Sequence, residues 1–140
     1  MRSLKLFTTI FLTILLFSGC DDKVVTQFYI KQDKGIELKT INLISRYPDI
    51  KNQIVTALKD ENIKIESNSS YSIKVDYTDY KKVCNNPMTS AYDRTFSGFI
   101  RLTLLKNGDR IYMCQKEFRG ELSADDFKRL FSLMKDDIDF

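Results

Sequence analysis

The spacing of apolar residues predicts strands in the middle of the chain. Between residues 71 and 78 apolar and polar residues alternate, which is the period of a strand with one buried face. Shorter apolar segments at 28–30, 36–43 and 63–65 predict further strands, and a turn at 32–35 joins the first two.

A hairpin follows these strands and is the clearest element of the sequence. The apolar segments 98–105 and 110–118 flank Asn107-Gly108, and Asn-Gly favours a type I′ turn whose two central residues have positive φ. A two-residue loop also sets the register, so two apolar pairs are expected on the buried face and one pair on the opposite face. The expected pairs are Leu104 with Ile111 and Leu102 with Met113 on the buried face, and Arg101 with Cys114 on the other.

Two segments have the apolar spacing of helices. The first begins at Pro48, which suits a first turn because its missing N–H has no partner there, and it ends near Asn62. The second follows Ser123, a favourable N-cap, and has Asp125 and Asp126 at the positive end of the helix dipole. The apolar stripes are Ile50, Ile54, Ala57 and Leu58 in the first helix, and Phe127, Leu130, Phe131, Met134 and Ile138 in the second.

The order of strands, helix, strand, hairpin and helix predicts the α+β class. We expect a two-layer sandwich, with a mostly antiparallel sheet of four or five strands and two helices on one face.

The amino terminus has the pattern of an export signal. Arg2 and Lys5 precede an uncharged, mostly apolar run at 6–17, and small residues then lead to Cys20. The run is shorter than the roughly 20 apolar residues that a membrane-spanning helix needs. An ordinary cleaved signal and a membrane-spanning anchor are the alternatives.

Phe17-Ser18-Gly19-Cys20 resembles the lipobox of bacterial lipoproteins, with Phe17 where that family prefers Leu. The resemblance implies that the chain is cut before Cys20, that the Cys20 thiol receives a diacylglycerol, and that the new amino group is acylated. More than one acyl chain makes a stable membrane anchor without a transmembrane helix.

This resemblance predicts the organisation of the chain and its location. We expect a signal peptide at 1–19, a lipidated tether at 20–27 and a single domain at 28–140. The order of elements is also similar to that of small envelope lipoproteins such as the lipopolysaccharide-assembly lipoprotein family. The expected location is the bacterial cell envelope, facing the periplasm, with the choice between inner and outer membrane left open.

Charge and composition argue against several classes of function. Loss of Arg2 and Lys5 with the signal lowers the net charge from +3 to +1, and no dense basic patch suggests a nucleic-acid partner. The chain has no histidine, which removes the usual base of nucleophilic sites and the commonest metal ligand. We expect no catalytic residues, no cofactor and no metal, and therefore no enzyme, although paired carboxylates keep a hydrolase open.

The remaining cysteines, Cys84 and Cys114, are an even number in an oxidising compartment. We expect a disulfide between them, and two separate buried thiols are the alternative. The segment Glu66–Ser70 contains Asn68 in an Asn-x-Ser pattern, which is a possible glycosylation site or a chance match.

Two features suit a binding role. The long connection 85–94 carries contact residues of the kinds found at interfaces, and a plain linker is the alternative. The non-core side of the sheet mixes aromatic and basic residues, which suit a partner or an anionic envelope polymer, and a solvated face is the alternative. The connection offers Met88, Tyr92 and Arg94; the sheet side offers Lys74, Tyr80, Lys82, Phe99, Arg101, Tyr112 and Lys116.

These observations lead to a non-enzymatic, lipid-anchored envelope protein that binds a partner, expected to be an envelope protein, and helps assemble or stabilise a complex. The alternative is an immunity or inhibitor lipoprotein that blocks a toxin or a hydrolase.

Overall fold

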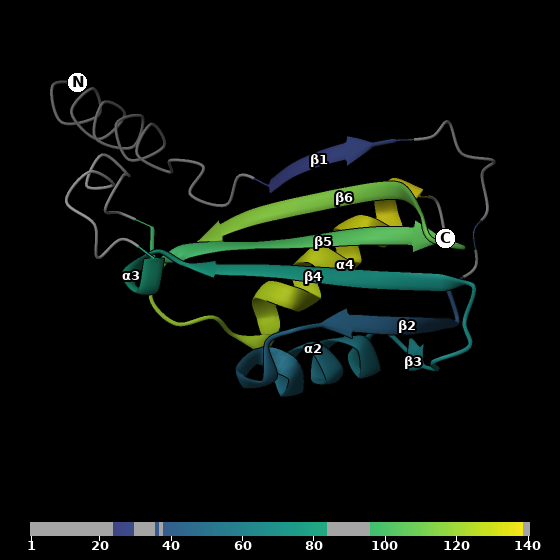
Figure 1. Ribbon diagram of the computed structural model, residues 1–140, viewed down its shortest axis with the longest axis horizontal. Helices are drawn as coiled ribbons and strands as arrows, with labels where there is room; N and C mark the ends of the chain where they lie inside the picture. Colours follow the sequence, from purple (N-terminus) through teal and green to yellow (C-terminus); the bar gives the residue numbers. More distant parts are fainter. Residues whose placement is uncertain (1–23, 30–35, 37, 84–95, 139–140) are drawn as a thin grey trace, which may run out of the picture.

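The computed structural model describes residues 24–29, 36, 38–83 and 96–138. In this part of the chain a six-stranded sheet has the order β1-β6-β5-β4-β2-β3 (Figure 1). Strands β1, β6, β5 and β4 pair antiparallel in succession, whereas β4, β2 and β3 pair parallel. The strands are β1 (Val24–Phe28), β2 (Thr40–Ser45), β3 (Lys64–Ile65), β4 (Tyr71–Asp79), β5 (Gly98–Lys106) and β6 (Asp109–Phe118).

The two long helices, α2 (Pro48–Asp60) and α4 (Ala124–Ile138), form the second layer. Figure 1 shows α4 running behind the central strands and α2 lying beside β2, and the two helices contact each other. A short helix, α3 (Tyr80–Val83), follows β4. The predicted α+β sandwich with helices on one face is confirmed, and its sheet has six strands rather than four or five.

Helix α2 forms where its apolar stripe predicts it. Pro48 stands in the first turn, and the buried residues are Ile50, Ile54, Ala57 and Leu58, the whole predicted stripe. The helix ends because Asn62 has a φ of 59°, a left-handed conformation that Asn tolerates. Ion pairs of Lys128 with Asp60 at 3.4 Å and of Lys135 with Glu61 at 2.7 Å join this end of α2 to α4.

The hydrophobic core lies between the sheet and the two helices. Burial of each large apolar side chain contributes about 1.5–3 kcal/mol, so this contact accounts for most of the driving force for folding. The fully buried members include Ile41, Ile73, Ile100, Leu102 and Leu104 from the sheet, and Phe127, Leu130, Phe131 and Met134 from α4.

The hairpin turn is confirmed, because Asn107 and Gly108 have φ values of 50° and 94°. The predicted register beyond the turn is wrong. A register shift between Leu104 and Leu105 pairs Leu104 with Tyr112, so Ile111 is an extra residue on β6. Both Ile111 and Tyr112 then belong to the buried core.

The shift changes the face of every later residue of β6, because side chains alternate with a period of two. Leu102 pairs with Cys114 instead of Met113, and Arg101 pairs with Gln115 instead of Cys114. Tyr112 and Cys114 therefore lie on the helix side of the sheet.

The sheet also begins earlier than expected. Strand β1 covers Val24–Phe28, so residues 24–27, predicted to belong to a tether, are paired with β6. None of the helices in the described part of the chain has the length and apolar character that crossing a bilayer requires.

Candidate binding face

The face of the sheet turned away from α2 and α4 is the candidate binding face, and we call it the open face. Cross-strand pairing places rows of side chains on it, and two of these rows carry the residues of interest. In one row Asp76 of β4, Arg101 of β5 and Gln115 of β6 stand side by side. In the next row Phe99 stands between Thr78 and Glu117.

Arg101 is the centre of this arrangement. Its Nε and Nη2 atoms donate to Oε1 of Gln115 at 2.9 and 2.7 Å, and its guanidinium lies 5.5 Å from the centre of the Phe99 ring. Because the amide of Gln115 is neutral, these hydrogen bonds orient the arginine without neutralising its charge. The guanidinium is thus oriented by an uncharged partner.

An aromatic residue from α3 extends the cluster. The Tyr80 ring lies 6.3 Å from the Phe99 ring, and the Tyr80 hydroxyl donates to Oε1 of Glu117 at 3.3 Å. We define the Arg101 cluster as Tyr80, Phe99, Arg101, Gln115 and Glu117. Aromatic residues and arginine are the types enriched at protein interfaces.

Charges of both signs border the Arg101 cluster on β4. Lys74 pairs with Asp76 at 3.3 Å, and the two side chains are 41% and 32% exposed. The charges around the Arg101 cluster are therefore mixed in sign, which suits a protein surface better than a uniformly anionic polymer.

Of the residues predicted for the sheet side, Phe99 and Arg101 lie on this face, Tyr80 joins them from α3 rather than from a strand, and Tyr112 does not lie on it. Tyr112 is buried on the helix side, where its hydroxyl donates to Oδ2 of Asp137 at 2.7 Å and its ring meets the Phe28 ring edge-on. Burial raises the pKa of the Tyr112 hydroxyl, and the hydrogen bond to Asp137 makes a smaller contribution in the same direction. The extra residue at Ile111 is the reason that the predicted face was wrong.

Cys114 is likewise on the helix side, and its thiol is free. The sulfur lies 3.8 Å from the carbonyl oxygen of Leu130 in α4. Burial raises the pKa of the Cys114 thiol to about 12, the charge of Asp137 adds to the rise, and a backbone hydrogen bond from Leu102 opposes it. The structure thus shows Cys114 as a buried free thiol, and because Cys84 lies outside the described residues, the disulfide between them stays a prediction.

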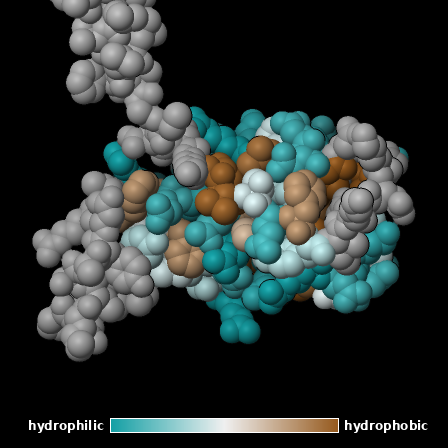
Figure 2. Space-filling view, turned by 90° about the horizontal axis from the view of Figure 1, so that it is seen from above, coloured by the Kyte–Doolittle hydropathy of each residue, from teal (hydrophilic) through white to brown (hydrophobic). Residues whose placement is uncertain are grey.

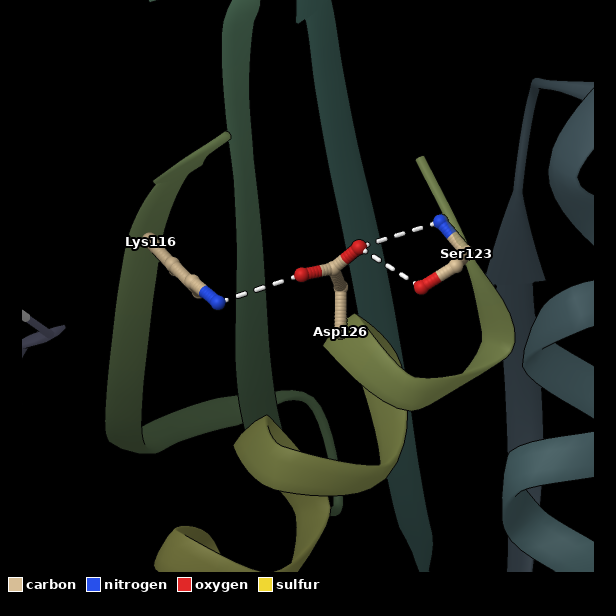
Figure 3. Close-up of polar contacts among 3 residues, drawn as sticks. All are labelled: Lys116, Ser123 and Asp126. Atoms are coloured by element: carbon tan, nitrogen blue, oxygen red, sulfur yellow. Dashed lines mark hydrogen bonds and ion pairs between the residues drawn. The ribbon is translucent and has the colours of Figure 1, made fainter. Parts of the chain in front are cut away.

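Lys116 was also expected on the non-core side and instead points towards α4 (Figure 3). Its Nζ contacts Oδ1 of Asp126 at 3.1 Å, and Oδ2 of Asp126 accepts from the backbone N–H and hydroxyl of Ser123 at 3.0 and 2.9 Å. Asp126 thereby caps α4 and neutralises a buried ammonium. Ser123 followed by Asp126 was the sequence signal for the cap, but nothing in the sequence indicated that Lys116 pairs with Asp126.

The pKa of Asp126 is set by opposing effects. Burial acts to raise it, but hydrogen bonds from Ser123 and Lys116 and the charge of Lys116 outweigh burial, so the pKa of this carboxyl lies below its ordinary value of 3.8. The charged form is therefore the one that the fold stabilises.

Sequence reasoning did not anticipate a hollow of about 350 Å³ near the end of β4. Asp49, Gln53, Tyr77 and Asp79 are among its lining residues. Burial and the charges of Asp79 and Asp49 raise the pKa of Tyr77. Nothing in the described part of the chain brings three acidic or cysteine side chains together as a metal site.

Lys82 was expected on the sheet side and lies in the short helix α3 instead. The remaining predicted positions divide into two groups. Asn68 is exposed in the turn between β3 and β4, which is where a glycosylation acceptor must lie, and its modification stays a prediction. The positions outside the described residues are Cys20, Cys84, Met88, Tyr92 and Arg94.

Comparisons with known proteins give distant structural similarities. No family model matches the chain, and no curated protein matches it. A PDZ domain protein from Parabacteroides distasonis is similar at a TM-score of 0.45 and 11% identity, over 80% of this chain and 34% of that one. The chain thus spans about a third of that protein's length.

Two further solved structures are similar over most of their own length. A PelC dodecamer from Paraburkholderia phytofirmans has a TM-score of 0.40 and 9% identity, over 74% of this chain and 87% of that one. A minor lipoprotein from Acinetobacter baumannii has a TM-score of 0.35 and 13% identity, over 75% and 93%. Because all of these similarities are distant, function has to be inferred from the residues of this chain.

Proposed function

We propose that this chain is a non-enzymatic lipoprotein, anchored in a cell-envelope membrane through Cys20, whose domain binds a partner protein through the open face. The anchor is supported by the signal pattern that ends at Cys20. The observation that carries partner binding is the Arg101 cluster, in which a cationic guanidinium is oriented by a neutral amide and an aromatic ring.

The chemistry of the cluster supports a protein partner. An arginine that is already oriented loses little rotamer entropy on binding, and its remaining donors suit a carboxylate or backbone carbonyl of the partner. Phe99 adds apolar area beside it. Arginine and tyrosine, both present in the Arg101 cluster, are enriched at measured hot spots, where truncation costs about 2 kcal/mol or more.

The anchor has a direct test. Cells producing the full chain are fed a clickable palmitate analogue, and we expect label on the wild type and none on Cys20→Ala. Label that persists in Cys20→Ala, or a wild type without acyl chains, would contradict the proposed anchoring.

Partner binding is tested by affinity capture of the mature chain from detergent-solubilised membranes. We expect a stoichiometric envelope protein with the wild type and a loss of about 30-fold in affinity with Arg101→Ala, which is the cost of one hot-spot residue. Arg129→Ala is the matched control, because Arg129 is exposed on α4 in the opposite layer.

The capture separates the two predicted functions. Equal recovery with both arginine variants would contradict binding through the open face. Recovery of one soluble hydrolase that the chain inhibits would favour the inhibitor alternative over assembly.

A further inference from the structure

In the part of the chain that the structure describes, strand β1 is an edge of the sheet, since it pairs with β6 on one side only (Figure 1). Val25 is 52% exposed and Phe28 is 51% exposed. Figure 2 looks onto this side of the molecule and shows apolar residues along it, between polar ones. The opposite edge, β3, is only two residues long; it begins with the exposed Lys64 and is followed by the exposed Glu66.

The direction of the backbone groups of β1 follows from one hydrogen bond. The N–H of Tyr29 donates to the carbonyl of Ile111 in β6 at 3.1 Å. Backbone groups alternate along an antiparallel strand, so those of Val25 and Gln27 also point to β6. The N–H and C=O groups of Val24, Thr26 and Phe28 therefore point outward, away from the sheet.

Exposed edge strands are usually protected against pairing by charged residues, proline or a bulge. Strand β1 has the sequence Val-Val-Thr-Gln-Phe, without charge or proline, and its register against β6 is unbroken. Within the described residues no backbone group pairs with the outer side of β1, and the strand carries no charge to repel a second strand.

We propose that β1 pairs antiparallel with β1 of a second copy of this chain, with Thr26 on the two-fold axis. In this register Val24 stands opposite Phe28 of the second copy, Thr26 opposite Thr26, and Val25 opposite Gln27. Every outward N–H and C=O of the strand gains a partner. Aromatic with β-branched residues and threonine with threonine are favourable cross-strand pairs.

The self-complementary pattern is the reason for choosing a second copy over another strand. The strand is uncharged, so two copies meet without repulsion. Its five residues bury less area than a stable dimer in free solution needs. Confinement to one membrane raises the effective concentration, and in this respect the inference rests on the proposed anchor.

Cysteine crosslinking of the full chain in membranes of the producing cells tests this register. Thr26→Cys places two thiols on the two-fold axis, where opposed Cα atoms are about 5.5 Å apart, within the range of disulfides. Val25→Cys and Gln27→Cys are matched controls. In this register Val25 stands opposite Gln27 of the second copy, so neither single variant places two cysteines opposite each other. Co-production of these two variants restores an opposed pair.

After oxidation with copper phenanthroline, we expect a band of twice the monomer mass with Thr26→Cys and with the co-produced pair. The wild type and the two single controls should give at least tenfold less of it. Absence of the Thr26→Cys dimer in protein with wild-type thermal unfolding, equal crosslinking at all three positions, or an adduct with another protein would each overturn the proposal. Palmitate labelling of the same samples reports the anchor separately, so failure of the anchor and failure of the pairing are distinguishable.

Discussion

Replacement of Asp126 by Asn tests the role of the ion pair between the sheet and α4. Lys116 is 5% exposed, and its side chain meets the Asp126 carboxylate at 3.1 Å. The Asn amide still accepts from Ser123 and so keeps the helix cap, but it leaves the buried ammonium without this carboxylate. The change therefore isolates the charge from the cap.

The expected magnitude follows from the burial of the two partners. Breaking a buried ion pair by removing one charge costs about 3–5 kcal/mol. The Asp126 side chain is 20% exposed, so water partly compensates and the lower end, about 3 kcal/mol, applies. Lys116→Met leaves the more exposed Asp126 carboxylate without its lysine, and the Met side chain fills the volume of the Lys side chain. It should therefore lower the free energy of unfolding by only about 1 kcal/mol.

Urea unfolding followed by circular dichroism measures these differences. With a slope of about 1.5 kcal/mol per M, Asp126→Asn should lower the midpoint by about 2 M. Asp125→Asn is the matched control, because Asp125 is exposed in the same turn of α4 and should cost less than about 1 kcal/mol. Equal midpoints for the two Asn variants would refute the reasoning.

The pH dependence gives a second measurement on the same proteins. The pKa of Asp126 is lowered in the folded state, so its carboxylate stabilises the fold above the ordinary value of 3.8. This stabilisation is lost as the pH falls through the lower, folded-state pKa. The difference in the free energy of unfolding between the wild type and Asp126→Asn should therefore be constant near neutral pH. It should become smaller below about pH 3.8.

Two further predictions concern β5 and β6. Gly98→Ala should destabilise the fold by about 3 kcal/mol, because the added Cβ would lie 2.0 Å from the Thr78 carbonyl oxygen. Gly108→Ala has open space around the added Cβ and is strained only by the positive φ, so it should cost about 1–2 kcal/mol in the same urea titration. Cys114 should resist iodoacetamide at pH 7.5 until urea unfolds the chain, because its thiol is buried and its pKa is raised; modification of its peptide in the folded protein, detected by mass spectrometry, would contradict this.

The two long helices, α2 and α4, were predictable because their apolar stripes are long and repeat several times, whereas the four-residue α3 has no such stripe. All five buried residues of α4 belong to the predicted stripe, and Ser123 with Asp126 gives the cap in the sequence itself. Local spacing and capping determine these elements, and no distant residue is needed to recognise them.

Strand β1 was less predictable because it pairs with a segment far along the chain. Val24–Phe28 has no turn signal linking it to β6, and its apolar residues are mostly exposed. Its place in the sheet depends on β6 offering an unpaired edge. Non-local pairing of this kind leaves only a weak trace in the sequence of the strand itself.

The candidate binding face depends on a single extra residue. The Asn107-Gly108 turn was recognised, yet Ile111 moves Tyr112, Cys114 and Lys116 from the open face to the helix side. No Gly or Pro next to Ile111 signals the extra residue in the sequence. The extra residue is favoured by tertiary packing, because it lets both Ile111 and Tyr112 reach the core. Arg101 lies on β5, which the shift does not turn over, so its predicted place on the open face was independent of that error. The sequence pattern thus predicted that Arg101 lies on the open face. It did not predict that Gln115 is its partner, because that pairing depends on the shifted register.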